Sequence, residues 1–485
     1  MSSIIHRLLV LSLLFLLPSC KVGPDYERPD IPVSDSFRMA EEAKDVQSLA
    51  NVPWWELYRD DELQKLIRIA LEGNKDLKRA VATVDEFAAR VLVSKTDFAP
   101  QMNATVNAPG FGNTRNVQFP GFPNPFNYYI QGNLSWELDF WGRIRRSNEA
   151  ALGDLLAREE NRRAVILQIV AGVAQTYFEL RQFDLQLEIA TRTLQAWNES
   201  VKLARARFRV GYINQLDVDQ FEAEQANAAA RIAELKRQMV QKENEISVLL
   251  GRNPTRITRG RALTEQVMPP LVPAGLPSEL LQRRPDVIQA EQQLAAATAR
   301  IGQAKADRFP KVSITGILGI ASPHLNRVVG NETFFGVAGV GVAAPLLNAQ
   351  VLGFQQEASE GQAGQAVAQY EQTILTAFRE VEDALVAVTT AVEQTAAQEK
   401  QVKALQSALR LANLRYTGGI ANYLDVLIAQ RNLFDAELSL ASTRRLHLVS
   451  VVQLYKALGG GWLPEPVAAN IAEQPRTHES AMRHE

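Results

Sequence analysis

Hydrophobic and polar residues alternate strictly in two segments of the first half of the chain. In residues 101–108 and 128–139, the even positions are mostly apolar and the odd positions are mostly polar. The apolar positions are Met102, Ala104, Val106, Ile130, Leu134, Trp136 and Leu138. A period of two predicts strands with one apolar face. Residues 311–320 repeat the pattern, and the glycine-rich residues 334–346 predict a fourth strand. Alternation alone equally suits a soluble hairpin with one wet face.

Apolar residues at helical spacing predict six helical segments between and around these strands. They are residues 61–98, 143–210, 216–250, 278–309, 350–417 and 424–458. The first and fourth lie just before Pro100 and Pro310, which cannot continue a helix. The return helices 216–250 and 424–458 follow short turns at Gly211 and Gly419. A glycine in such a turn can take the positive φ that ends a helix.

A heptad seam runs along the segment 143–210. Leu180, Leu187, Leu194 and Val201 recur every seven residues, as do Phe183, Ala190, Trp197 and Ala204. The segment 350–417 keeps Val388, Val402 and Leu409 in its seam, but also places Thr395 and Gln398 there. A helix over 143–210 would be about 100 Å long at about 1.5 Å per residue. A narrow seam on so long a rod requires helical partners.

The two halves of the chain repeat each other. Leu203–Phe208 matches Leu411–Tyr416, and the same offset of 208 relates Asp217 to Asp425 and Gly251 to Gly459. Near the start of each half the offset is 210, as between Asp76 and Asp286. A colinear series of matches indicates a duplication, with residues 61–251 as the first repeat and 278–459 as the second.

The N-terminus has the pattern of a secretory signal over residues 1–19. His6 and Arg7 precede an apolar run, Leu8–Leu17, that is too short to span a membrane. The sequence Leu-Pro-Ser-Cys ends at Cys20, the one cysteine of the chain, and resembles a lipobox. We therefore expect Cys20 to carry a covalent lipid, N-acyl and S-diacylglycerol, as the first residue of the mature protein. The alternatives are a buried N-terminal helix and a free thiol.

Composition excludes several classes of function. The formal net charge of −2 does not favour a nucleic-acid partner. The five histidines show no metal-ligand spacing, so we expect no metal site and no cofactor besides the lipid. The glycine-rich Gly336–Gly341 opens no predicted helix, which argues against a phosphate loop. No catalytic constellation is apparent, and we expect a protein that is not an enzyme.

After Cys20, no apolar stretch reaches the length of a membrane-spanning helix. A membrane crossing would therefore need a closed β-barrel, and bacterial barrels have at least about 8 strands. Four strands per chain are too few, but three chains supply twelve. A homotrimer solves this closure problem and also supplies partners for the long helices.

Several motifs together resemble the outer membrane efflux factors, the TolC and OprM-like proteins, in their NodT-type lipoprotein branch. They are Cys20–Tyr26, Trp54–Tyr58, Trp136–Arg143, Arg283–Val287 and Tyr416–Leu427. The resemblance implies a mixed α and β trimer: a twelve-stranded β-barrel continued by a twelve-helix periplasmic α-barrel. It also implies an equatorial domain, which we assign to residues 20–60 and 252–277. Residues 460–485 either belong to this domain or form a disordered tail. The implied partners are outer-membrane lipid, a periplasmic adaptor (membrane fusion) protein and an inner-membrane transporter of the RND type.

The two helix turns are the candidate functional site. In a trimer, Asp217 and Asp425 would form a ring of carboxylates around one opening, and the resemblance implies that acidic residues here constrict the closed duct. Some relatives carry a second acidic residue where this chain has Ile428, so its constriction would differ. Arg207, Arg415 and Tyr416 are candidates for the pairing that holds this gate shut. The alternative is that both aspartates cap the returning helices.

The same turns resemble the grooves in which adaptor tips dock. The candidate residues are Phe208, Gly211, Asn214, Gly419 and Asn422. The alternative is that these residues only end and cap the helices and bind no partner. The sequence thus predicts the exit duct of a tripartite efflux system, which passes drugs, toxic compounds or ions across the outer membrane of a Gram-negative bacterium. The rival interpretation is a lipid-anchored periplasmic coiled coil with a structural or adhesive role and no pore.

Overall fold

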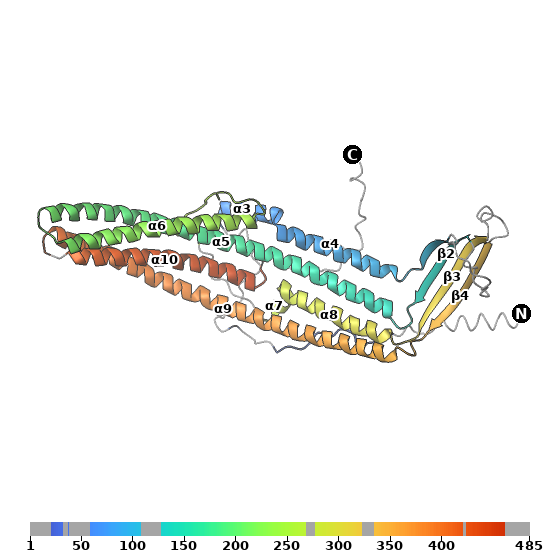
Figure 1. Cartoon of the computed structure of the whole chain (residues 1–485). Helices are drawn as coiled ribbons and strands as arrows, with labels where there is room; N and C mark the ends of the chain where they lie inside the picture. Colours follow the sequence, from blue (N-terminus) through green and yellow to red (C-terminus); the bar gives the residue numbers. More distant parts are fainter. Residues whose placement is uncertain are drawn as a thin grey trace. The chain divides into compact units, whose positions relative to one another are not determined.

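The computed structural model describes residues 21–32, 37, 59–107, 128–267, 277–322, 334–420 and 423–460 (Figure 1). The predicted signal peptide, Cys20, Asn422 and most of the tail lie outside these ranges. The chain divides into two compact units. Of the described residues, the first unit contains those within 21–31, 79–162 and 288–373, and the second contains the others. The two units are treated separately below.

The first unit contains one antiparallel sheet, in the order β1-β2-β3-β4. Its strands are β1 (Gln101–Asn107), β2 (Tyr128–Leu138), β3 (Lys311–Ser322) and β4 (Phe334–Ala343). The predicted fourth strand reached residue 346, but β4 ends before Pro345, which lacks the N–H that a ladder needs.

The strand register brings most apolar positions of the four strands to one face, although Ile317 and Val337 lie opposite each other on the other face. Met102 lies opposite Leu134, Ile130 opposite Ile320, and Ile314 opposite Val340. On the other face, Asn133 donates a hydrogen bond to Thr105 at 3.2 Å. The apolar face is exposed to a large degree, with Met102 70% and Val106 73% accessible. Within the described strands, β1 and β4 each have a single neighbour.

The predicted helix over 61–98 is in fact two helices, α3 (Asp61–Gly73) and α4 (Lys75–Thr96). Asn74 separates them with an extended ψ of 133°. Its side-chain carbonyl accepts the N–H groups of Asp76 and Leu77, which caps α4. The predicted helix over 278–309 is likewise α7 (Pro277–Arg283) and α8 (Pro285–Ala306). Pro285 disfavours helical geometry at Arg284, the residue before it.

Both breaks are tied to the end of a return helix, in the second unit. Asn74 donates from its amide to the carbonyl of Leu249 at 2.8 Å. Arg284 donates in the same way to the carbonyl of Ala457 at 3.0 Å. The two donors, Asn74 and Arg284, are related by the repeat offset of 210, and the two acceptors, Leu249 and Ala457, by the offset of 208. Each half of the sequence therefore contains the same joint, made by an amide in one half and a guanidinium in the other.

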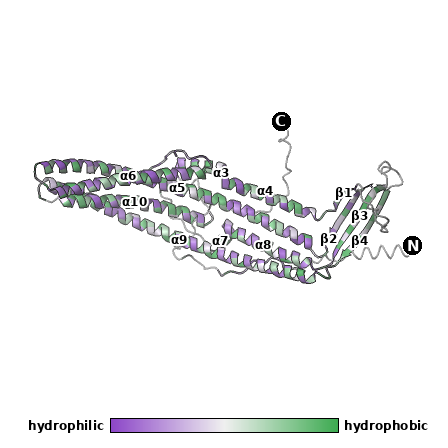
Figure 2. Cartoon of the chain, in the orientation of Figure 1, coloured by the Kyte–Doolittle hydropathy of each residue, from purple (hydrophilic) through white to green (hydrophobic). Residues whose placement is uncertain are grey.

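Four long helices follow the strands along the chain: α5 (Arg143–Arg209), α6 (Gln215–Leu249), α9 (Ala349–Thr417) and α10 (Tyr423–Ala457). α5 has 67 residues and α9 has 69. Hydrophilic residues interrupt all four helices (Figure 2), and no described helix has an apolar stretch long enough to cross a membrane.

The core of the second unit gathers around α3, α5 and α10. Its fully buried members include Ile67, Tyr177, Leu180, Val452 and Tyr455. The buried carboxylate of Asp60 caps α3 and accepts hydrogen bonds from the Tyr177 hydroxyl and the Arg261 N–H, both at 3.0 Å. Burial of the ring raises the pKa of Tyr177, which keeps its hydroxyl protonated as the donor. One carboxylate thus connects the start of α3, the middle of α5 and the segment after α6.

Candidate functional site

The turns after α5 and α9 have the same backbone geometry. Gly211 and Gly419 have φ of +78° and +73°. The N–H of Gly211 donates to Phe208 and that of Tyr212 to Arg207; Gly419 and Ile420 repeat this pattern to Tyr416 and Arg415. These paired bonds are a Schellman motif, which satisfies the last carbonyls of a helix. Both turns therefore lie where the sequence predicts them, and their backbone N–H groups cap the ends of α5 and α9.

Asp217 caps the start of α6. The side chain of Asn214 accepts the N–H of Asp217 at 2.9 Å, and the carboxylate of Asp217 accepts the N–H of Asn214 at 3.2 Å. This reciprocal capping box is the structural role that the sequence left open for Asp217. Asp425 occupies the first turn of α10 and is exposed. Neither aspartate is within ion-pair distance of Arg207 or Arg415 in the part of the chain that the structure describes.

A continuous series of aromatic contacts joins all four long helices near these turns. Trp197 of α5 meets Phe221 of α6 edge to face, with ring centroids 6.3 Å apart. Phe221 stacks on Tyr423 of α10 at 3.8 Å, and Tyr423 meets Tyr416 of α9 at 4.9 Å. The guanidinium of Arg207 closes the series, 4.4 Å from the centre of the Tyr416 ring. We call these five residues the aromatic clasp.

Trp197, Phe221 and Tyr423 of the aromatic clasp lie in a buried cluster, and the partly buried Tyr416 packs against it. The cluster also contains Val201, Ala204, Val218, Val426 and Leu427. Burial raises the pKa of Tyr423, so its hydroxyl stays neutral within this apolar surrounding. Of the predicted gate residues, Arg207 and Tyr416 meet, whereas Arg415 is exposed. Sequence reasoning missed Trp197, Phe221 and Tyr423 as members of the site, because their contacts join segments far apart in the chain.

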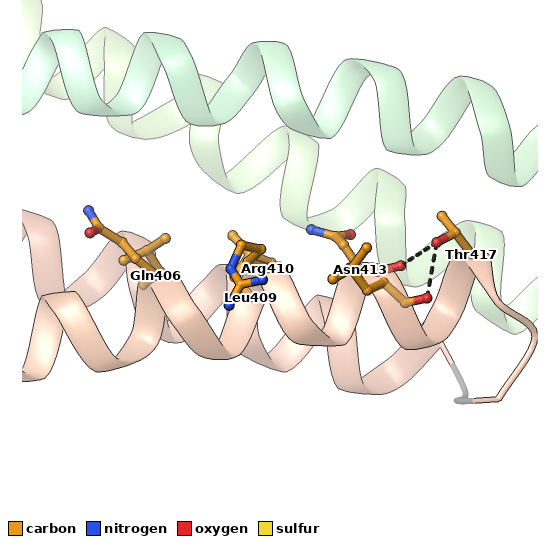
Figure 3. Close-up of a pocket in the computed structure, with 7 residues that line it drawn as sticks. Gln406, Leu409, Arg410, Asn413 and Thr417 are labelled. Carbon is orange, nitrogen blue, oxygen red and sulfur yellow. Dashed lines mark hydrogen bonds between the residues drawn. The ribbon is translucent and has the colours of Figure 1, made fainter.

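Close to the α9–α10 turn, an open groove runs along α9 and reaches α10 (Figure 3). It encloses about 550 Å³ and is lined by Gln406, Leu409, Arg410, Asn413, Leu414, Thr417 and Leu433. The hydroxyl of Thr417 donates to the carbonyls of Asn413 and Leu414, so it caps the helix end. The polar positions 406, 410, 413 and 417 follow one helical stripe, a signal that was present in the sequence.

Large apolar side chains remain exposed at both turns. Tyr212 is 82% accessible and Ile420 is 75% accessible, while Phe208 is 41% accessible. Exposed apolar groups of this size are typical of protein-binding surfaces. Among the described residues, no group of three or more His, Cys, Asp or Glu side chains is arranged to hold a metal ion.

Comparison with known proteins places these features in one family. The family model described as outer membrane efflux protein matches residues 66–252 and 276–460. The toluene efflux pump outer membrane protein TtgC of Pseudomonas putida is 35% identical over 463 residues, which cover 94% of this chain and 96% of the relative. The cation efflux system protein CusC of Escherichia coli is 32% identical over 459 residues, covering 94% and 99%.

Solved structures agree in fold. The open state of the MtrE outer membrane channel of Neisseria gonorrhoeae matches with a TM-score of 0.81 and 30% identity, covering 91% of this chain and 98% of that one. These likenesses define a class, the efflux channels of the outer membrane of Gram-negative bacteria, which are transport proteins and not enzymes. The chain belongs to the outer membrane efflux protein family. The resemblance carried by motifs such as Trp136–Arg143 and Arg283–Val287 is confirmed.

Proposed function

We propose that this chain is the exit duct of a tripartite efflux system and that it works as a homotrimer with twelve strands in one barrel. The observation that carries this proposal is the four-stranded sheet, which has an exposed apolar face and two edge strands. Unpaired edges are costly in lipid, because no water is present to bond their N–H and C=O groups. Pairing β1 of one copy with β4 of the next removes every edge once the ring closes.

The long helices support the same assembly. In the single chain, α9 is exposed over much of its length from residue 392 to residue 417, including Leu411 and Leu414, which are 49% and 58% accessible. Four long helices from each of three copies make a twelve-helix barrel in which such side chains find partners. The proposed equatorial domain would be built from the segments outside the repeats.

We assign the periplasmic gate to the turns and the aromatic clasp. In the trimer, Asp217 and Asp425 give six carboxylates around one opening, two from each chain. Such a ring favours cations and resists close approach of its own charges. Arg207 and Tyr416 would hold the α9–α10 pair against the α5–α6 pair in the closed state. Arg415 is exposed and therefore free to pair with a carboxylate of another copy.

The exposed turns and the groove on α9 are the proposed docking surface of a periplasmic adaptor. Tyr212, Ile420 and Phe208 supply apolar contacts, while Arg410 and Asn413 supply polar ones. The adaptor would connect the duct to an inner-membrane transporter, for which we favour the RND type. Cys20 would carry the lipid that anchors each chain, and Cys20→Ala is expected to weaken membrane retention.

The cargo belongs to the broad class of drugs, toxic compounds or ions. Relatives of similar identity are named for toluene and for cations. A duct lining need not recognise its cargo, because selection can be made by the pump.

Ion conductance tests the proposed function. The purified protein should have the mass of three copies. Reconstituted in planar bilayers, it should give discrete conductance steps. A lipid-anchored coiled coil without a pore would leave the bilayer resistance unchanged, and that result would refute the duct.

A further inference from the structure

The segment that follows Cys20 is held in the first unit by several hydrogen bonds and ion pairs. Residues 21–32 form neither helix nor strand. Terminal segments of this kind are normally poorly ordered unless specific contacts hold them. Here the N–H of Val22 donates to the carbonyl of Trp141, in the short connection between β2 and α5, at 3.2 Å.

Arg146 of α5 is the centre of these contacts. Its side chain is 2% accessible, although it carries a full charge. The guanidinium donates to the carbonyls of Val22 at 3.2 Å and Gly23 at 3.0 Å. It also pairs with Asp25 and Glu149, both at 3.0 Å. Three of its four acceptors therefore belong to the N-terminal segment. The segment thus supplies most of the hydrogen-bond acceptors and part of the negative charge that a buried guanidinium requires.

The backbone at Gly23 fits only a glycine. Its φ is +93°, and a Cβ there would lie 2.4 Å from the Cα of Gly302 in α8. A Cβ on Gly302 would in turn lie 2.6 Å from the Nε of Arg146. Two glycines thus allow the segment to approach α8 closely enough for Arg146 to reach its carbonyls.

Charged contacts hold the segment on either side of Gly23. Lys21 pairs with Glu149 at 2.5 Å and with Asp25 at 3.1 Å. The hydrogen bond to Glu149 raises the pKa of Lys21, and the hydrogen bond from Lys21 lowers the pKa of Asp25. Further along, Arg28 grips both carboxylate oxygens of Glu291 in α8, and the Tyr26 hydroxyl donates to the same group at 3.2 Å.

We propose that α5 and α8 form a binding site for the chain's own N-terminal segment, Lys21–Arg28, with Arg146 as its central ligand. The site holds the segment beside the β2–α5 connection. A lipid on Cys20 would therefore be attached close to this connection, with little freedom to move away from it. It rests on the proposed function only in taking Cys20 as the lipid-bearing residue.

Proteolysis of the purified full chain in detergent tests this site. Trypsin can cut the Lys21–Val22 bond, and a glutamate-specific protease can cut after Glu27. Cutting requires the segment to leave its site, so its rate reports the open population. Mass spectrometry of the released termini measures both cuts whether or not a lipid is attached, and the intact mass reports the lipid separately.

Gly23→Ala is the decisive variant, because residue 23 lies outside every described helix and strand and the added Cβ would meet the backbone of Gly302 directly. We expect both bonds to be cut at least about tenfold faster than in the wild type, and the same in Arg146→Ala. The matched controls are Gly353→Ala, where a Cβ meets no atom within 4 Å, and Arg300→Ala, which removes the ion pair to Asp154. Both should be cut at the wild-type rate. Equal rates for Gly23→Ala and the wild type would overturn the proposal.

Discussion

The guanidinium of Arg207 lies 4.4 Å above the ring of Tyr416, so that the last turn of α5 is held against the last turn of α9. Both side chains are partly exposed. The contact lies at the end of the aromatic clasp, whose other rings are more deeply buried. It is therefore the contact in the series that can break with the smallest loss of buried apolar surface.

Removing this contact should favour the open duct. A cation–π contact at an exposed site contributes about 0.5–1 kcal/mol, which corresponds to a roughly two- to fivefold shift in a closed–open equilibrium. Arg207→Ala should raise the mean conductance by that factor in planar bilayers. Tyr416→Ala also removes the ring contact with Tyr423 and should raise it by at least as much. Tyr416→Phe keeps the aromatic face and should stay near the wild-type value. An equal rise in Tyr416→Phe would show that the hydroxyl, and not the ring, holds the turn.

Charge at the turn should control both the width of the opening and its preference for ions. Asp425 is exposed in the first turn of α10 and carries one of the charges of the proposed gate. Asp425→Ala should raise conductance, or leakage of antibiotics into cells, and should lower the preference for cations. Asp219→Asn removes a neighbouring exposed charge outside the proposed gate and is the control. Unchanged values in Asp425→Ala would remove this residue from the gate.

Two glycines with the same φ sign should respond very differently to alanine. At Gly211 a Cβ meets nothing within 4 Å, so Gly211→Ala carries only the cost of a left-handed residue, about 1–2 kcal/mol. At Gly251 the Cβ would lie 2.1 Å from the carbonyl oxygen of Gly73, and the joint between α3 and α6 must shift. The midpoint temperature of thermal unfolding should therefore fall by a few degrees for Gly211→Ala and by much more for Gly251→Ala. Equal losses would contradict the close approach at Gly251.

The joints at Asn74 and Arg284 should also differ in how much they contribute to the free energy of unfolding. Arg284 is buried and pairs with Asp286 and Glu380 besides donating to Ala457. Arg284→Ala leaves the carbonyl of Ala457 without this donor and breaks two ion pairs whose carboxylates are 40% accessible. Hydrogen bonds to a charged group contribute about 1.5–3 kcal/mol, and we expect a loss at the upper end of that range. Asn74→Ala removes neutral hydrogen bonds and should cost about 1–2 kcal/mol. A larger fall in thermal stability for Asn74→Ala would reverse this ranking.

The ends of the long helices were predictable from sequence to within about one residue, because Gly211 and Gly419 take the positive φ that terminates a helix. The breaks at Asn74 and Arg284 were missed, since the apolar spacing continues through both. Gly73-Asn74 and Arg284-Pro285 nevertheless carried a local signal, as glycine and the residue before proline disfavour helix.

The candidate site was predictable only in part. Phe208, Gly211 and Asp217 could be located because the internal repeat aligns them with Tyr416, Gly419 and Asp425. Tyr423 and Phe221 stand where the other repeat has Gln215 and Ala429, so the repeat gives no guide to them. Their stacking depends on tertiary packing between α6 and α10, which local patterns do not specify.

Cross-linking of the edge strands tests the central claim, that three copies share one barrel, most directly. Within one chain β1 and β4 are three strand spacings apart, about 14 Å, which is beyond the reach of a disulfide. A chain with one cysteine at Thr105 in β1 and a second at Val337, Gly339 or Gly341 in β4 can therefore link only to another copy. For at least one of these pairs, oxidation in the membrane should give covalent dimers and trimers and nothing larger. No linkage in any pair, or a ladder that continues past three, would contradict the account.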